Sequence, residues 1–90
     1  MKEIRLSTQY KKDYKRYKHQ PKKIEKLFEV LELLKHGKPI PPNNKPHPLK
    51  GNYQGYMECH IEGDFLLIWI DEKDNVVELV RLGTHSELFG

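Results

Sequence analysis

The chain has 90 residues, of which 37% are hydrophobic and 32% are charged. This length allows one domain with a modest core and excludes a substrate domain joined to a separate cofactor domain. The net charge is only +3, but residues 1–50 have a balance of +9 and residues 51–90 a balance of −6. Such a cationic half is typical of well-solvated helices, or of a surface that binds RNA, DNA or an acidic partner.

The chain contains one cysteine and no long apolar stretch. Cys59 by itself excludes an intramolecular disulfide and a zinc site built from several cysteines. No apolar run approaches the ~18 residues that a membrane-spanning helix needs, and the first thirty residues lack the apolar core of a signal peptide. We therefore expect a cytoplasmic protein that has no membrane partner.

The N-terminal residues predict a short strand followed by an amphipathic helix. Residues 3–7 alternate polar and apolar side chains. From Thr8 to about Lys18, tyrosines recur at positions 10, 14 and 17 among lysines and an arginine. Tyrosines among cations can stack RNA bases, but helical spacing favours the simpler interpretation that they pack on a sheet.

A second helix is predicted from Pro21 to His36, because proline suits a first helical turn and Gly37 favours a helix end. Its core-facing stripe consists of Ile24, Leu27, Phe28, Leu31 and Leu34. Residues 37–54 carry five prolines and no periodicity, which is typical of a functional or disordered connection. Because prolines restrict the unfolded chain, we expect a held, extended loop that presents His47.

Three more strands are predicted at residues 56–61, 65–70 and 76–82, and the short turns between them indicate an antiparallel meander. In the first, alternation places Glu58 and His60 on one face and Cys59 on the other. The second is continuously apolar, as in a central strand covered on both faces. The order β-α-α-β-β-β predicts a single α+β domain over residues 1–90, with two helices on one face of a small antiparallel sheet and polar groups on the other.

Chemically versatile side chains gather on that opposite face. They are His60, Asp64 at the adjoining turn, Arg81 near the end of the last strand and His85 after it, with His47 able to approach from the proline-rich loop. Imidazole titrates near neutral pH, so one ring can accept a proton while another donates one. Arginine offers a planar fork of donors to phosphoryl oxygens. With RNA the substrate's own 2′-OH can attack, so no protein nucleophile, metal or cofactor is required.

Simpler interpretations of the same residues stay open at this point. The three histidines and Asp64 could bind zinc, although their spacing matches no usual signature. Each histidine could be an ordinary polar residue, and Arg81 could pair with Glu78 or Asp64.

Three ordered segments resemble a known family. Residues 47–51 (HPLKG), 55–64 (GYMECHIEGD) and 81–89 (RLGTHSELF) are similar to YafQ-type toxins of the RelE/ParE superfamily, and residues 1–46 agree with it in pattern and length. One such segment would be a weak signal, whereas three in the right order are strong. Phe65 stands where the best-known member is expected to have tryptophan, which keeps an aromatic ring there.

The resemblance implies the toxin of a bacterial type II toxin–antitoxin system. Such a toxin is expected to cleave mRNA in the ribosomal A site by 2′-OH attack, leaving a 2′,3′-cyclic phosphate and a 5′-OH. A cognate antitoxin is expected to cover the active-site face and the basic half, and operator DNA is expected to be contacted only through that antitoxin.

Matching residues give an expected site. The acid–base set is His47, His60, Asp64 and His85, with His85 favoured as general acid and Asp64 or His60 as base. Arg81 is expected to contact the phosphate or the transition state, and Phe89 and Lys50 the substrate. The residues expected on ribosomal RNA are Lys11, Lys12, Lys15 and Arg16. The alternatives are a noncatalytic member of the fold that blocks translation or takes part in transcriptional repression, and a ribosome-independent RNase.

Overall fold

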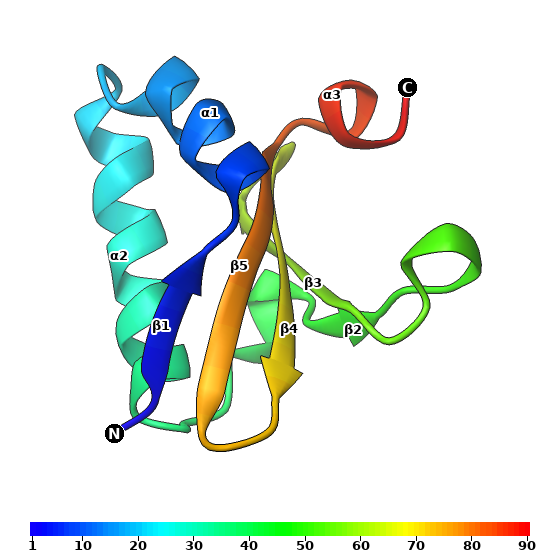
Figure 1. Ribbon diagram of the computed structural model, residues 1–90. Helices are drawn as coiled ribbons and strands as arrows, with labels where there is room; N and C mark the ends of the chain where they lie inside the picture. The colour runs from blue at the N-terminus through cyan, green and yellow to red at the C-terminus, as the bar shows by residue number, and fades with distance from the viewer.

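A computed structural model describes residues 1–90, and Figure 1 shows how they are arranged. Its strands and longer helices are β1 (Glu3–Leu6), α1 (Thr8–Tyr17), α2 (Pro21–Lys35), β2 (His47–Pro48), β3 (Met57–Glu62), β4 (Phe65–Glu72), β5 (Val76–Gly83) and α3 (His85–Phe89). Short 3₁₀ turns at Pro42–Asn44 and Gly51–Tyr53 lie in the connection between α2 and β3. All the predicted strands and helices are therefore present, and the structure adds β2 and α3.

The strands form one sheet in the order β1-β5-β4-β3-β2. Strands β2 to β5 pair antiparallel, which confirms the meander, whereas β1 runs parallel to β5 and makes the sheet mixed. Alternation in residues 3–7 indicates a strand and its two faces, but it carries no information about the strand's partner or direction.

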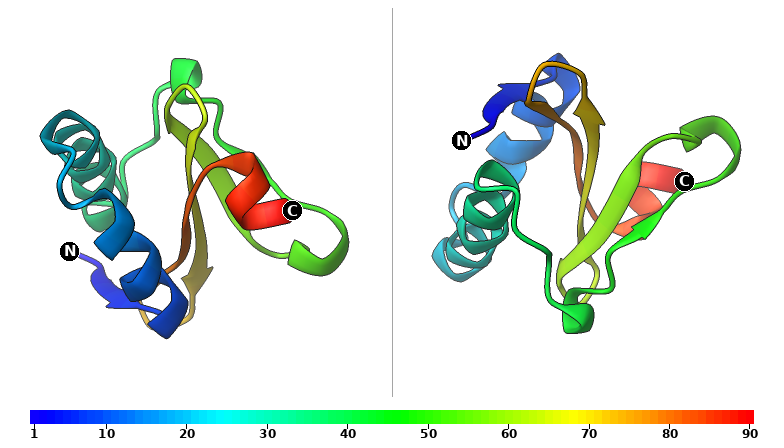
Figure 2. Two further views of the ribbon diagram at one scale, coloured as in Figure 1. Left: turned by 90° about the horizontal axis from the view of Figure 1, so that it is seen from above. Right: turned by 90° about the horizontal axis from the view of Figure 1, so that it is seen from below.

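Helices α1 and α2 pack together on one face of the sheet, as Figure 2 shows from two sides. Tyr10 and Tyr17 are buried there beside Leu27, Leu34 and the inward side chains of the sheet, so packing explains the tyrosine stripe. The core-facing residues predicted for α2 need one correction, because Phe28 is 50% exposed. Val30 is buried in its place, at 4% exposure.

The opposite face is less polar than the sequence predicted. Leu66 and Ile68 of β4 are fully buried there beneath Leu88 of α3, with Tyr53 and Tyr56 packed against them. Helix α3 and the segment around residues 49–56 supply this cover, and they lie across the sheet from α1 and α2 (Figure 2). Strand β4 is thus covered on both faces, as expected, and the polar groups lie around a small apolar cluster.

Helix α3 is short, but several contacts fix it. The Thr84 hydroxyl accepts from the Glu87 backbone and the Glu87 carboxylate accepts from the Thr84 backbone, which is a capping box. The hydroxyl of Tyr17 also donates to Glu87, so α3 is tied to α1. A Cβ on Gly83 would lie 2.6 Å from Glu87 Oε1, so the capping box requires glycine there.

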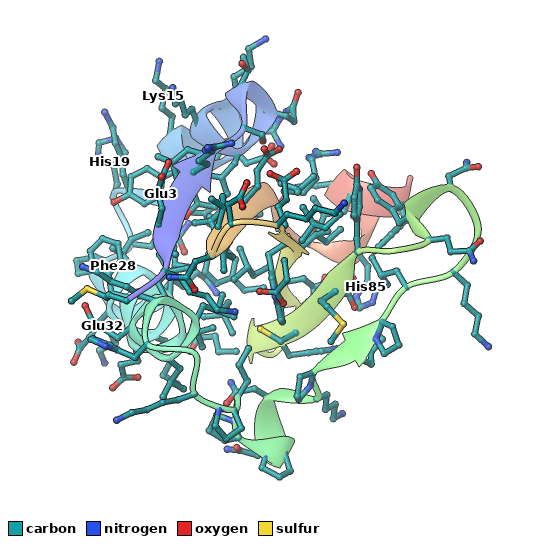
Figure 3. The ribbon with its side chains drawn as sticks, turned by 60° about the horizontal axis from the view of Figure 1, so that its bottom comes forward. Glu3, Lys15, His19, Phe28, Glu32 and His85 are labelled. Carbon is teal, nitrogen blue, oxygen red and sulfur yellow. The ribbon has the colours of Figure 1, made fainter.

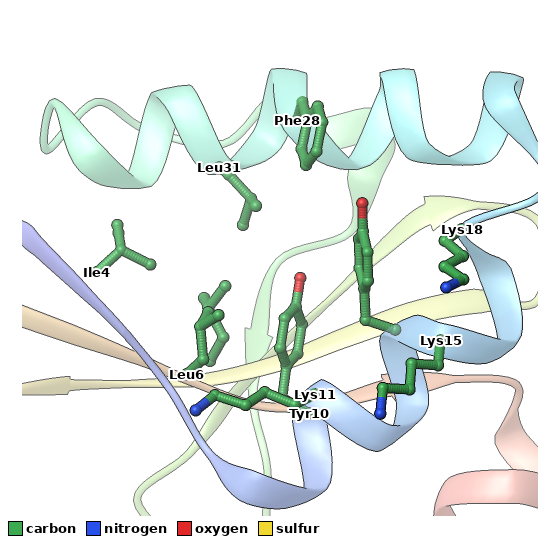
Figure 4. Close-up of a pocket in the computed structure, with 10 residues that line it drawn as sticks. Ile4, Leu6, Tyr10, Lys11, Lys15, Lys18, Phe28 and Leu31 are labelled. Carbon is green, nitrogen blue, oxygen red and sulfur yellow. The ribbon is translucent and has the colours of Figure 1, made fainter.

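An open apolar groove lies between β1, α1 and α2, on the side of the molecule away from α3 (Figure 4). Its volume is about 560 Å³, and Leu6 and Phe28, 45% and 50% exposed, lie in its wall. Lys11, Lys15 and Lys18 also line it. None of the helices combines the length and the apolar character needed to span a membrane.

Candidate active site

The centre of the site is a contact between Asp64 and His85. Asp64 lies in the β3–β4 turn and His85 is the first residue of α3, on the far side of the sheet from Phe28 (Figure 3). Oδ1 of Asp64 accepts from the His85 backbone N–H at 2.9 Å and lies 2.7 Å from Nδ1 of the ring. These hydrogen bonds, the backbone one first, hold the pKa of Asp64 below its usual value. Because the carboxylate accepts at Nδ1, the ring presents Nε2 to solvent.

His60 lies beside this pair. Its ring centroid is 5.9 Å from that of His85, and its Nδ1 lies 3.1 Å from the carbonyl oxygen of Gly63. A carbonyl can only accept, so Nδ1 is the donor and Nε2 is the nitrogen that can take up a proton. The structure therefore brings His60, Asp64 and His85 together as predicted.

His47 has a different immediate partner, which the sequence did not predict. It lies on β2 opposite Glu58 of β3, and its Nε2 is 3.2 Å from Glu58 Oε1 while its Nδ1 is 2.7 Å from the Lys45 carbonyl oxygen. Both ring nitrogens of His47 face oxygen atoms that can accept a hydrogen bond. If Nδ1 donates to the Lys45 carbonyl oxygen, the contact between Nε2 and Glu58 is a hydrogen bond only when one of the two side chains carries an additional proton. His47 and His60 are diagonal neighbours on one face of the sheet, a spacing of roughly 7–8 Å.

Glu58 is unusual because its carboxylate is buried, at 2% exposure. Its Oε2 atom has no hydrogen-bond partner within the chain. A buried carboxylate needs compensating hydrogen-bond partners, and His47 is the side chain in contact with it. Glu58 thus orients His47 toward the sheet.

Arg81 pairs with a residue that the sequence did not predict as its partner. Its Nε lies 2.8 Å from Oδ2 of the fully buried Asp13 of α1, so pairing with Glu78 or Asp64 is not what the structure shows. Burial alone would raise the pKa of Asp13, but hydrogen bonds from Arg81, Leu82 and Gln9 outweigh it and the pKa is lowered. Asp13 first, and also Tyr53, raise the pKa of Arg81.

Aromatic rings connect Arg81 with the histidines. Tyr53 meets Phe89 edge to face at 5.6 Å, and Phe89 lies 6.0 Å from the His85 ring. Phe89 is 46% exposed and is therefore accessible to a ligand. Lys50 is also exposed, between β2 and the turn that carries Tyr53.

The four basic residues expected on ribosomal RNA are all exposed but do not form one patch. Lys11 and Lys15 line the apolar groove. Lys12 and Arg16 are one helical turn apart on another side of α1, where Arg16 lies 3.4 Å from Glu87 of α3. No three His, Cys, Asp or Glu side chains are grouped closely enough to hold a metal ion.

The sequence did not predict roles for Asp13, Tyr53 and Glu58, although it contains a signal for two of them. Asp13 is the only acid in the basic helix, and it shares the stripe of Tyr10 and Tyr17 at positions i, i+3 and i+7. Glu58 has the same strand phase as His60. Tyr53 lies in an irregular loop, where no periodicity points to a side chain's neighbours.

The lowered pKa values make a prediction about stability in acid. Asp13 and Asp64 bind protons less readily in the folded chain than when unfolded, where the pKa of Asp is about 3.9. Their stabilisation is therefore complete above that pH and is lost as the pH falls through the folded values. Urea unfolding between pH 7 and pH 2 should show the free energy of unfolding decreasing below about pH 4, and Asp13→Asn should flatten this dependence. An unchanged pH dependence in Asp13→Asn would contradict the assignment.

The fold and the site together define a small α+β protein that carries a surface cluster of two histidines and an aspartate, with an arginine of the same sheet paired to a buried aspartate. The family model described as "Bacterial toxin of type II toxin-antitoxin system, YafQ" matches residues 2–90, and the chain belongs to this family.

Individual relatives agree with the family assignment. The mRNA interferase toxin YafQ of Escherichia coli K12 is 38% identical over 98% of this chain and 96% of its own length. The crystal structure of the E. coli DinJ–YafQ complex has a chain that matches with a TM-score of 0.86 and 35% identity over the whole of both chains. A metal-bound toxin from Helicobacter pylori matches with a TM-score of 0.89 and 39% identity, over 99% of this chain and all of that one.

Proposed function

We propose that the chain is an mRNA interferase, an endoribonuclease that cleaves mRNA in the ribosomal A site by acid–base catalysis. The observation that supports this most is the contact of His85 with Asp64 beside His60, since two imidazoles with accessible Nε2 atoms suit proton transfer at both ends of a phosphodiester. The curated relative from E. coli is named an mRNA interferase toxin, which agrees.

The geometry favours one assignment of the protein's proton transfers. Nε2 of His60 takes the proton of the 2′-OH as its oxygen attacks the adjacent phosphorus. His85 must enter this step as an imidazolium, which the carboxylate of Asp64 stabilises through Nδ1–H. Its Nε2 gives a proton to the departing 5′ oxygen, and the ring becomes neutral. The products are a 2′,3′-cyclic phosphate and a 5′-OH, without a covalent intermediate. Asp64 already accepts two hydrogen bonds from His85, so it is better suited to orient His85 than to act as the base.

The remaining site residues bind and orient the substrate in this proposal. Arg81 contacts the phosphoryl oxygens as negative charge develops on them. Phe89 and Tyr53 present ring faces on which a base can stack, and the exposed Lys50, three residues before Tyr53, can contact a phosphate. His47 and Glu58 lie in contact beside the histidine–aspartate cluster, where His47 can hydrogen-bond the substrate or take part in proton transfer.

Mapping mRNA ends after incubation with translating ribosomes tests the proposed function. Cuts at a fixed position within the A-site codon support it, and comparable cutting of naked RNA would instead favour a ribosome-independent RNase. Ribosome binding without any cleavage would favour the noncatalytic alternative.

Because Lys12 and Arg16 lie on a different side of α1 from Lys11 and Lys15, their contribution to ribosome binding can be tested by itself. We propose that Lys12 and Arg16, on the side of α1 next to α3, contact ribosomal RNA together with the other cations of the helix. Lys12→Ala with Arg16→Ala should weaken ribosome binding and reduce the dependence of log K on log salt by about one unit per lost phosphate contact. The measurement is a salt titration of binding, with Lys38→Ala, away from α1, as the control. Unchanged binding at every salt concentration would contradict the proposal.

The apolar groove is a candidate binding surface for an antitoxin. E. coli YafQ is found in complex with DinJ, and we propose that a cognate antitoxin binds this chain as well. The groove combines exposed Leu6 and Phe28 with a rim of three lysines, so an acidic segment with an apolar face fits it in charge and hydrophobicity. The antitoxin would then bind the groove in addition to the active-site face that the resemblance implies.

Leu6→Ser with Phe28→Ser should therefore weaken the antitoxin complex by at least 10-fold, since interface hot spots are worth about 2 kcal/mol or more. Calorimetric titration with the antitoxin from the neighbouring reading frame measures this. Both side chains are about half exposed, so the variant should stay folded and keep its cleavage activity. Equal affinity of the variant and the original chain would exclude the groove from the interface.

A further inference from the structure

The hydrogen-bond pattern around Asp13 indicates a role beyond holding a helix on a sheet. Asp13 is fully buried in α1, a helix that otherwise carries only basic charges. Its Oδ2 atom accepts from Arg81 Nε at 2.8 Å and from the Leu82 backbone N–H at 3.0 Å, and its Oδ1 accepts from Arg81 Nη2 at 3.4 Å and from Gln9 at 3.1 Å. Four donors from α1 and β5 therefore fix this carboxylate in one orientation.

The contact with Asp13 uses one edge of the Arg81 guanidinium and does not involve the other edge. A guanidinium has five N–H donors in a plane, and Asp13 engages the edge formed by Nε and Nη2. Both donors of Nη1 and one donor of Nη2 are left. The Arg81 side chain is 18% exposed, whereas Asp13 is fully buried, so the arginine is the member of the pair that reaches the surface. Tyr53, which contacts Phe89 of the site, is the other side chain that affects Arg81.

A purely structural role accounts poorly for this pair. Tyr10, Tyr17, Leu79 and Leu82 already join α1 to the sheet through apolar contacts. A buried ion pair is often no more stabilising than apolar side chains of similar volume, because removing both charges from water is costly. What the pair does provide is a fixed direction for the other edge of the guanidinium.

We propose that Asp13 is a positioning residue for catalysis, which holds Arg81 in the one orientation that presents its remaining donors to the scissile phosphate. This rests on the proposed nuclease function and deepens it. An arginine already fixed before substrate arrives needs no reorganisation when charge develops, which is the condition under which such donors lower a barrier most. Asp13 itself is fully buried and touches neither substrate nor histidine.

The test is a double-mutant cycle on ribosome-bound mRNA. Asp13→Asn should lower kcat by at least about 10-fold and change KM by less than about 2-fold, because the lost interaction is made in the transition state. In an Arg81→Ala background the same substitution should change kcat by less than about 2-fold, because Asp13 acts through Arg81. Asp71→Asn, which removes an exposed carboxylate from its ion pair with Lys2, is the matched control and should leave kcat unchanged.

The possible outcomes separate this proposal from the function on which it rests. Equal losses of kcat in both backgrounds, or no loss in either, would show that Asp13 does not act through Arg81. Absence of cleavage by the unaltered chain would overturn both proposals. If Asp13→Asn does not fold, NMR of the unaltered chain decides: the Nε–H proton of Arg81 should exchange with solvent much more slowly than those of Arg5 and Arg16. Equal exchange rates of the three would contradict a fixed guanidinium.

Discussion

Replacing His85 with alanine is expected to lower the rate of mRNA cleavage by about 10²–10⁴-fold, the usual contribution of a general acid or base. The reason is that Nε2 of His85 is the proposed proton donor to the leaving 5′ oxygen, and Asp64 holds its ring in place. The His85 side chain is 57% exposed, so its removal leaves no cavity in the core. Single-turnover cleavage on programmed ribosomes measures the effect directly.

His19→Ala is the matched control for this prediction, since His19 is an exposed histidine in the turn between α1 and α2. The His19 variant should cleave at the original rate, and both variants should have the thermal stability of the original chain. Cleavage by His85→Ala within about threefold of the original rate would remove His85 from the catalytic set.

Replacing Arg81 with alanine is expected to impair both activity and stability. Cleavage should fall by about 10²–10³-fold, as when one donor to a developing oxyanion is removed. The free energy of unfolding should fall by about 3–5 kcal/mol, because Asp13 is left as a buried charge without its partner. Urea unfolding and single-turnover cleavage measure the two losses separately.

A double substitution distinguishes the contribution of Arg81 to catalysis from its contribution to stability. Asp13→Leu with Arg81→Met replaces both charges with apolar side chains, so stability should recover much of the loss seen in Arg81→Ala. Activity should stay low, since no guanidinium is present. Full activity in the stable double variant would contradict a role for Arg81 in catalysis.

The sequence predicted the helices and the meander because those features depend on local periodicity. Tyr10 and Tyr17 and the alternation around Cys59 repeat with helical and strand periods, and the structure confirms both faces. The parallel pairing of β1 with β5 joins residues more than seventy positions apart, and no local pattern encodes it. Phe28 fitted a core stripe by spacing, but it lies in the wall of the groove between β1, α1 and α2 and is 50% exposed, because no side chain of the chain fills that groove.

Helix α3 could have been predicted and was not. Thr84-x-x-Glu87 is a capping-box sequence, and recognising it would have placed His85 at the first position of a helix. Treating residues 84–89 as a tail still gave the right neighbours for His85, because the strand end and the β3–β4 turn fix its position.

The sequence predicted which three residues meet at the centre of the site, because they belong to the segments that resemble the toxin family. It did not predict the contacts that depend on how other elements lie against the sheet. His60, Asp64 and His85 meet as expected. The contacts of Arg81 with Asp13 and of His47 with Glu58 depend on how α1 and β2 lie on the sheet. Strand spacing allowed Arg81 several carboxylate partners, and only the tertiary structure distinguishes among them.

The most direct test of the central claim uses an mRNA with a single 2′-deoxynucleotide at the position of cleavage. Programmed ribosomes carry either this mRNA or the unmodified one in the A site, and the ends of the products are analysed chemically. If the 2′-OH is the nucleophile, the unmodified mRNA should give a 2′,3′-cyclic phosphate and a 5′-OH, and the substituted linkage should stay intact. Cleavage of the substituted linkage, or products with a 5′-phosphate and a 3′-OH, would contradict the account.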